Sequence, residues 1–417
     1  MSMSAHNQLR IGVGAADITP EKPLPMQGFA NRKGEFTGVY QPIYAKAMAI
    51  DDGHNQIVII CADLALWGNS NLEKIRAAVS EKYGLTPAQI IFNVSHTHCG
   101  PIVRDPEYAE KLVGTAINLV DKCMSAKVPA KLYYGRGYTD LGVSRRGKNR
   151  DGSIYWGLNP YGPVDREVVV LKAQDLQGKV IGILSNHSCH PSTIAGYLIG
   201  GDFVGCAAKI LEEQWPGATA LFMQGAGGDV KPYHAQVENP LLFEYGGGPP
   251  EAEAVGRKFA AAIAAVLAQP MQEVAGSIAA AFGVVELPLL NKVVDDDAPA
   301  PFQGRKRRLA RIAQLMLESM DADGNYLQTK PCEVYVARIG PDFIMVGLNG
   351  EICVRIGLRI KAQLLPKMAL VTGYTGLHIG YVPSMDMIPE KGYEAGVPYS
   401  LEAEDYLVDK VIELVGE

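Results

Sequence analysis

Apolar positions along this chain follow two alternating patterns, short runs of apolar and β-branched residues and longer stretches with helical spacing. The short runs predict strands at residues 11–14, 45–50, 56–61, 89–94, 131–134, 167–173, 180–186, 218–223, 276–287, 333–338, 343–348 and 369–374. The longer stretches predict helices at residues 70–84, 105–125, 206–214, 250–268, 305–320, 352–364 and 401–415. Because strands and helices alternate from end to end, we expect an α/β fold with a mixed β-sheet covered by helices on both sides.

Turn and capping residues add detail to this pattern. The turn Asp51-Asp52-Gly53 predicts a hairpin, and Ser70 with Glu73 predicts a capping box that opens a helix. Residues 135–163 are rich in Gly, Arg, Asn and aromatic residues and predict a long loop, and loops of this length usually carry function or are disordered. The acidic stretch 295–302 predicts a solvated loop.

Composition narrows the class of protein. The 417 residues are 47% hydrophobic and 20% charged, which is typical of a large globular protein, and no shift in composition divides them, so we expect a single domain over residues 1–417. No stretch is apolar enough to span a membrane, and the first residues have no apolar core of the kind that a secretion signal needs. The net charge of −6 without a basic run argues against nucleic acid or an anionic membrane as partner. Seven cysteines without paired spacing fit a reducing compartment, so we expect a cytoplasmic protein; a homo-oligomer is left open.

Two groups of histidines follow predicted strands. Ser95-His96-Thr97-His98-Cys99-Gly100-Pro101 comes after residues 89–94, and alternating strand geometry puts His96 and His98 over one spot. His187 and His190 come after residues 180–186. Either group alone is as compatible with structural packing as with metal binding. Two groups at strand ends, where ligands bind in α/β proteins, favour a metal site.

A metal-dependent hydrolase usually adds a carboxylate to its imidazole ligands. Glu351 follows the predicted strand 343–348 and is the candidate, although a glutamate in the first turn of a helix is also favoured by the helix dipole alone. The glycine-rich segment 224–232 matches neither common nucleotide-binding pattern, and its glycines are more simply explained by close approach of the backbone to the active centre.

Several strings, in this order, resemble the catalytic domain of the neutral ceramidase family from about Leu9 to about Gly396. They are Asp17-Ile18-Thr19-Pro20 with Gly28, the string 95–101, His190-Pro191, Gly201-Asp202-Phe203-Val204-Gly205 and the segment 224–232.

Members of that family are zinc-dependent amidases that cleave the N-acyl amide of ceramide. The resemblance implies a zinc cofactor, with His96 and His190 as ligands and Glu351 as the carboxylate ligand. It implies that His98 handles the proton or the tetrahedral intermediate. It also places Arg145 opposite the substrate and Tyr393 near the zinc.

The chain also departs from the family pattern. Where the family supplies a tyrosine as the fourth zinc ligand, His378 takes the position, so we expect a site of three histidines and Glu351; Tyr381 could reach it instead. Lys231 replaces a family serine, which excludes a serine nucleophile there. The family's C-terminal β-sandwich and secretion signal are not recognised, which places ceramide itself in doubt.

The sequence therefore predicts a zinc-dependent amidohydrolase acting on a linear N-acyl amide of a small molecule, through a metal-activated water. His98 would act as general base and then protonate the leaving amine, while Arg145 and Tyr393 would stabilise the oxyanion or orient the substrate. Two alternatives stay open: an ester or lactone hydrolase with the same site, and a non-catalytic metal- or ligand-binding homologue.

Overall fold

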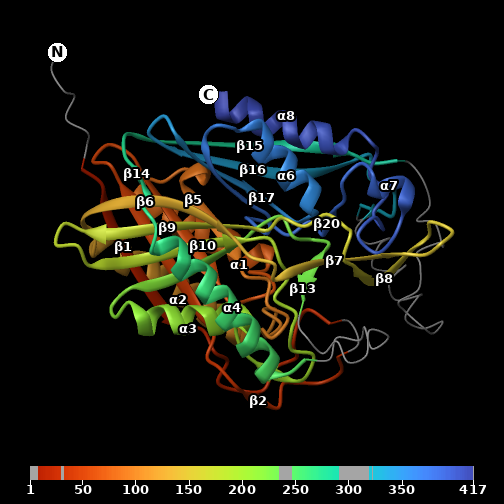
Figure 1. The fold of residues 1–417 in the computed structure, drawn as a ribbon, viewed down its shortest axis with the longest axis horizontal. Helices are drawn as coiled ribbons and strands as arrows, with labels where there is room; N and C mark the ends of the chain where they lie inside the picture. The colour runs from red at the N-terminus through yellow and green to blue at the C-terminus, as the bar shows by residue number, and fades with distance from the viewer. Residues whose placement is uncertain (1–7, 30–31, 234–246, 291–318, 322, 417) are drawn as a thin grey trace.

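The computed structural model describes residues 8–29, 32–233, 247–290, 319–321 and 323–416. It is built in four layers, two β-sheets packed face to face with helices on each outer side, as Figure 1 shows. The helices on one outer side are α1 (Asn69–Tyr83), α2 (Pro106–Ser125), α3 (Asp202–Gln214) and α4 (Pro249–Leu267). Those on the other are α6 (Val354–Gln363) and α8 (Ala403–Gly416). The predicted α/β class with a mixed sheet and helices on both sides is confirmed.

The larger sheet has nine strands in the order β12-β10-β9-β6-β1-β3-β4-β5, with β14 on β6. Their bounds are β1 (Arg10–Asp17), β3 (Tyr44–Asp51), β4 (Gln56–Ala62), β5 (Ile90–Val94), β6 (Val128–Tyr138), β9 (Glu167–Asp175), β10 (Val180–His187), β12 (Thr219–Gln224) and β14 (Gln272–Val274). The pairs β4–β5 and β10–β12 are parallel and the others antiparallel. Both histidine groups therefore follow strands of one sheet.

The smaller sheet has four strands in the order β15-β16-β17-β19. They are β15 (Ile278–Pro288), β16 (Thr329–Ile339), β17 (Phe343–Leu348) and β19 (Met368–Thr372). Short ladders complete the fold: β2 (Gly38–Val39) with β11 (Leu198–Ile199), β13 (Val230–Pro232) with β7 (Gly142–Lys148) and β8 (Ile154–Asn159), and β18 (Glu351–Ile352) with β20 (Tyr381–Val382). A 3-10 turn covers Pro87–Gln89, and α7 covers Met387–Glu390.

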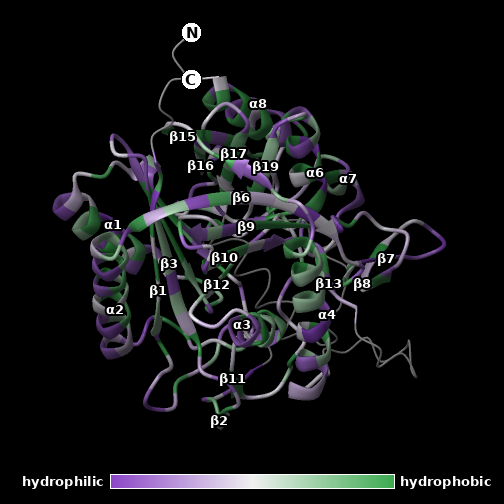
Figure 2. Ribbon diagram, turned by 60° about the vertical axis from the view of Figure 1, so that its left-hand side comes forward, coloured by the Kyte–Doolittle hydropathy of each residue, from purple (hydrophilic) through white to green (hydrophobic). Residues whose placement is uncertain are grey.

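Strand alternation divides the apolar residues of the large sheet between two cores. Met48 and Ile59 point to one face and share a buried cluster with Phe343 of the smaller sheet. Ala47 and Ile60, one position away on the same strands, belong to the cluster under α1 and α2. Figure 2 shows α2 along β1 and β3 with α1 beside α2, and α3 near β12 with α4 beside α3. Burial on both faces explains why β3, β4 and β5 are almost continuously apolar.

The two edges of the large sheet meet. The backbone N–H of Gln224, at the end of β12, donates to Oδ1 of Asn93 on β5 at 2.8 Å. Asn93 is fully buried, and its Nδ2 donates to the carbonyl of Gly373 (2.8 Å) and to Oγ1 of Thr375 (3.2 Å) beyond β19. The ends of β5, β12 and β19 are thus joined at one side chain, which brings together segments distant in the sequence.

Three local expectations are corrected. Residues 135–163 are not a long loop, since most of them form the end of β6 and the β7–β8 hairpin, whose alternation is hidden by glycines and arginines. The capping box at Ser70 is not formed: α1 begins at Asn69 after Gly68, with no side-chain cap. Glu351 lies on β18 and not on a helix.

The predicted acidic loop 295–302 lies outside the described residues, as does the predicted helix 305–320 except for its last two residues. The single-domain organisation over residues 1–417 stays a prediction.

Candidate metal centre

His96 and His190 are held in the same tautomer by backbone carbonyls. His96 Nδ1 lies 2.8 Å from the carbonyl oxygen of Ala65, and His190 Nδ1 lies 2.8 Å from that of Gly227. Because a carbonyl only accepts hydrogen bonds, each Nδ1 must carry the proton, and each Nε2 presents a lone pair. His96 also has a left-handed backbone (φ 62°), a conformation that non-glycine residues rarely adopt. Such a strained residue must be held by its surroundings, which is frequent at functional sites.

Glu351 brings a carboxylate to these two lone pairs. Its Oε2 lies 3.3 Å from His96 Nε2 and 3.2 Å from His190 Nε2, and its backbone N–H donates to the carbonyl of Gly380 at 2.8 Å. Although burial alone would raise it, the two imidazoles hold the pKa of Glu351 well below its ordinary value. Burial and the charge of Arg145 lower the pKa of His190 to about 4. With each Nδ1 donating to a carbonyl, the two Nε2 atoms and the Glu351 carboxylate face one another, an arrangement that a cation or a proton must stabilise.

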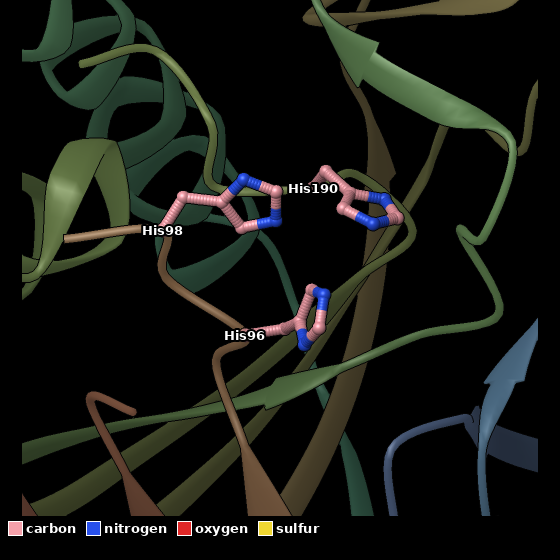
Figure 3. Close-up of side chains that lie close together, drawn as sticks. All are labelled: His96, His98 and His190. Atoms are coloured by element: carbon pink, nitrogen blue, oxygen red, sulfur yellow. The ribbon is translucent and has the colours of Figure 1, made fainter. Parts of the chain in front are cut away.

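His98 completes a group of three buried imidazoles. One ligand nitrogen from each of His96, His98 and His190 lies within 4.8 Å of the others, and Figure 3 shows the three rings around a common space. Burial and the charges of His96 and His190 lower the pKa of His98 well below 6.5, so its imidazole is neutral near pH 7. Its Nδ1 is buried and has no hydrogen-bond partner among the described residues.

The backbone of Gly28 packs directly on His98. A Cβ atom at Gly28 would lie 2.5 Å from Cγ of His98, and the ring of Phe29 meets the His98 ring edge-on at 4.6 Å. Gly28 also has a φ of 107°, so only glycine fits this position without strain. The N-terminal loop thus fixes the orientation of His98.

The donor set fits a divalent cation that prefers nitrogen and oxygen ligands, such as zinc. Both imidazoles donate their other N–H to a carbonyl, which is the usual arrangement behind a metal-bound histidine. Of the predicted ligands, the structure brings His96, His190 and Glu351 together, with His98 beside them.

The structure does not bring His378 into contact with this group. Its backbone N–H donates to Oδ1 of Asn69 at 2.9 Å, and its side chain lines a small pocket with Trp67 and Tyr374. Burial lowers the pKa of His378 to about 4; the charge of Glu351 opposes this shift, and that of His96 adds to it. Its role as a fourth ligand stays a prediction.

Tyr374 is a residue that sequence reasoning missed. Its hydroxyl lies 3.5 Å from His190 Nε2, and its ring lies over His96 with centroids 4.6 Å apart. It has a left-handed backbone (φ 54°) and donates its N–H to the carbonyl of Gly350 at 2.8 Å. Its position at the end of the predicted strand 369–374 was the available signal, but a tyrosine at a strand end is too common to be selected on that basis. Burial, together with Glu351, raises the pKa of Tyr374 well above its usual value, so it stays a hydroxyl donor.

Arg145 and Tyr393 both contact Tyr381. Arg145 is almost fully buried, and its Nη2 donates to the Tyr381 hydroxyl at 2.9 Å. The Tyr393 ring meets that of Trp156 edge-on at 4.5 Å and that of Tyr381 at 5.4 Å. The catalytic roles predicted for Arg145 and Tyr393 stay predictions.

The glycine-rich segment after β12 lies against the metal centre. A Cβ at Gly227 would lie 2.8 Å from the backbone of Ser188, and one at Gly228 would lie 2.7 Å from the carbonyl oxygen of Glu351. The glycines therefore permit backbone contact with both ligand-bearing segments. Lys231 follows on β13, where burial and the charge of Arg145 lower its pKa to about 8.

Comparisons with known proteins agree with this architecture. Residues 9–114 match the family model described as neutral/alkaline non-lysosomal ceramidase, N-terminal. Neutral ceramidases of Drosophila pseudoobscura pseudoobscura and Drosophila melanogaster are each 23% identical over 257 residues. These alignments cover 54% of this chain and 36% of each relative, so the chain matches about a third of the length of these relatives.

The fold matches a solved structure over nearly its whole length. The crystal structure of neutral ceramidase from Pseudomonas aeruginosa superposes with a TM-score of 0.77 at 19% identity, covering 98% of this chain and 74% of that one. A structure described as ceramidase complexed with C2 superposes with a TM-score of 0.76.

These relatives correct the predicted location. The cytoplasmic prediction is wrong, because the neutral ceramidases that the chain resembles are secreted or membrane-associated. The unpaired cysteines and the polar first residues were too weak a basis for predicting the cellular compartment. Within the described part of the chain, no helix is both long and apolar enough to cross a membrane.

Proposed function

Because this chain belongs to the neutral ceramidase family, as its motifs predicted, we propose that it is a zinc-dependent hydrolase of N-acyl amides. The observation that carries the proposal is the convergence of three acceptor atoms. Glu351 Oε2 lies 3.3 Å from His96 Nε2 and 3.2 Å from His190 Nε2. A zinc ion bound there would supply an activated water and polarise the substrate carbonyl.

The protein residues around this point have separate tasks in the proposal. His96, His190 and Glu351 hold the metal, and the Ala65 and Gly227 carbonyls keep the two imidazoles in the tautomer that can bind it. The sequence adds His378 as a fourth ligand, and Tyr381 is the alternative.

His98 is the proposed proton carrier. Its imidazole is neutral near pH 7 because burial and the neighbouring imidazoles lower its pKa, so one of its ring nitrogens is available to accept a proton. In Figure 3 the ring faces the space between His96 and His190. The same nitrogen would then protonate the leaving amine.

Arg145 and Tyr393 are proposed to orient the substrate or to stabilise the oxyanion. The support is their position: Arg145 is a buried cation bonded to Tyr381, whose backbone pairs with Glu351 on β18. A preorganised cation beside a developing negative charge is an effective form of transition-state stabilisation. The proposed substrate is a small-molecule acyl amide, and ceramide is one member of that class.

The test combines metal analysis with a substrate panel. We expect about one zinc per chain in the purified protein, and hydrolysis of N-acyl amides across a series of acyl lengths, with the matching esters as a parallel series. A preparation without stoichiometric metal, or hydrolysis of the esters alone, would contradict the proposal.

A further inference from the structure

A single buried carboxylate bridges two adjacent arginines next to the metal centre. Glu394 is 2% exposed; its Oε1 accepts a hydrogen bond from Arg145 Nε and its Oε2 accepts one from Arg146 Nη1, both at 2.9 Å. A buried charge of this kind is stable only when it is paired and hydrogen-bonded, and here both oxygens are engaged.

Arg145 is fixed on its other sides as well. Its Nη2 donates to the Tyr381 hydroxyl at 2.9 Å, and its guanidinium carbon lies 4.3 Å from the centre of the Trp156 ring. An arginine side chain has several rotatable bonds, and its planar fork keeps a defined direction only when edge and face are both held. Glu394 supplies the charged contact at Nε, and the Tyr381 hydroxyl accepts from Nη2, the neighbouring nitrogen of the guanidinium.

Tyr381 connects this cluster to a metal-binding residue. It is the first residue of β20, and in the parallel ladder it pairs with Glu351 on β18, whose N–H donates to Gly380 at 2.8 Å. A shift of the guanidinium would change the hydrogen bond of the Tyr381 phenol without breaking any contact of His96 or His190.

We propose that Glu394 is a positioning residue, which acts by holding the Arg145 guanidinium against the Tyr381 hydroxyl beside the metal centre. This inference rests on the proposed hydrolase function. Glu394 itself does not touch the substrate; it fixes the direction of a cation that does its work at the reacting group.

Glu390 provides a matched control. It is an ion-pair partner of Arg146 (3.4 Å) and Lys148 (3.1 Å), its side chain is 33% exposed, and no ion pair joins it to Arg145 among the described residues. Glu390→Gln removes a carboxylate from the same cluster of arginines and leaves the Arg145–Glu394 contact in place.

The first experiment measures kcat, KM and zinc content of the full chain on an N-acyl amide that it hydrolyses. We expect Glu394→Gln to lower kcat about 10- to 100-fold with zinc content unchanged, and Glu390→Gln to stay within about two-fold of the parent. Arg145→Lys should lower kcat similarly, and the double variant Arg145→Lys/Glu394→Gln should be no slower than Arg145→Lys alone, since both changes act on one contact. Effects that multiply, or zinc lost from Glu394→Gln, would overturn the proposal. If Glu394→Gln does not fold, the loss of kcat in Arg145→Lys at full zinc content tests the same contact from the other side.

The second experiment does not depend on hydrolysis. The chain has three tryptophans, and Trp156→Phe identifies the contribution of the one that covers Arg145 to the fluorescence. We expect Glu394→Gln to increase acrylamide quenching of the Trp156 emission, because the guanidinium no longer shields that ring, while Glu390→Gln leaves it unchanged. Unchanged quenching in Glu394→Gln refutes the positioning role, even if no amide is hydrolysed. Increased quenching in a protein that hydrolyses no amide supports the positioning of Arg145 by Glu394 and contradicts only the proposed reaction.

Discussion

The candidate metal centre and the arginine cluster on the β7–β8 hairpin are both buried, but different kinds of contact hold them. At the metal centre, His96 and His190 are oriented by carbonyl groups of the main chain, so their geometry follows from where the backbone lies. In the arginine cluster, Arg145 is oriented by other side chains, chiefly Glu394, Tyr381 and Trp156. We infer that substitutions at the first region should abolish metal binding, whereas those at the second should change turnover in a protein that still binds metal.

The largest effect is expected from removing one of the imidazoles proposed to bind the metal. His190→Ala should eliminate stoichiometric zinc and lower hydrolysis by about 10³-fold or more, because it removes one of the three donor atoms that converge in the proposed site. Elemental analysis and initial rates measure the two effects. The exposed His54 supplies the control, since His54→Ala should leave both at the level of the parent. An active His190→Ala protein that still binds zinc would show that His190 is not a metal ligand.

The next effect concerns the side chain that joins the three strand ends. Asn93→Ala removes the acceptor of the Gln224 N–H and the donor to Gly373, both inside the core, and we expect a loss of about 3 kcal/mol in the free energy of unfolding. Denaturant unfolding measures it, with Asn149→Ala at an exposed hairpin turn as the control. Because Asn93 lies three residues before His96, weaker zinc binding should accompany the loss. A variant as stable as the parent would mean that the strand ends are held together by apolar packing alone.

A smaller effect should appear as a pH dependence. Burial lowers the pKa of His378 to about 4, below the value near 6.5 expected of an unfolded chain. Between these two values the unfolded chain takes up a proton that the folded chain does not, so stability falls as the pH is lowered from 6.5 towards 4. Since His378 is only partly enclosed, we expect protonation of this residue to lower the free energy of unfolding by about 1 to 2 kcal/mol between pH 7 and pH 5.

Urea unfolding of chelator-treated protein at the two pH values tests this expectation. His378→Asn should reduce the difference in stability between them, and His54→Asn should not. The same variant also tests the sequence-based ligand assignment, because a fourth ligand should be needed for full zinc affinity. An unchanged pH dependence would show that the His378 imidazole is solvated.

The smallest effect belongs to the ring that covers Arg145. Trp156→Leu removes a cation–π contact at 4.3 Å, worth about 1 kcal/mol, so we expect kcat to fall about five-fold with zinc content unchanged. Tyr161→Leu, at a side chain that is 98% exposed in the turn after β8, should have no effect on kcat. Loss of zinc from Trp156→Leu would contradict the inference that substitutions in the arginine cluster leave metal binding intact.

The sequence alone predicted the strands that carry the candidate metal centre. Apolar runs at residues 89–94, 180–186 and 343–348 predicted the strands, and the polar residues that end them gave His96, His190 and Glu351. These assignments succeed because burial on both faces produces continuous apolar runs, and because strand ends are where polar side chains accumulate. The β7–β8 hairpin was missed since its glycines and arginines hide the alternation of a strand.

What the sequence determined by itself is the α/β class, the family resemblance and the types of donor available to a metal, because these depend on local patterns and on residue identity. Only the tertiary structure decided which donors meet. Glu351 joins two histidines that precede it by 161 and 255 positions because β18 pairs with β20 and the ends of β5, β12 and β19 converge on Asn93. Tyr374 and Glu394 likewise acquired their positions from contacts between segments hundreds of residues apart, and the free energy of such contacts is not encoded in any short stretch of sequence.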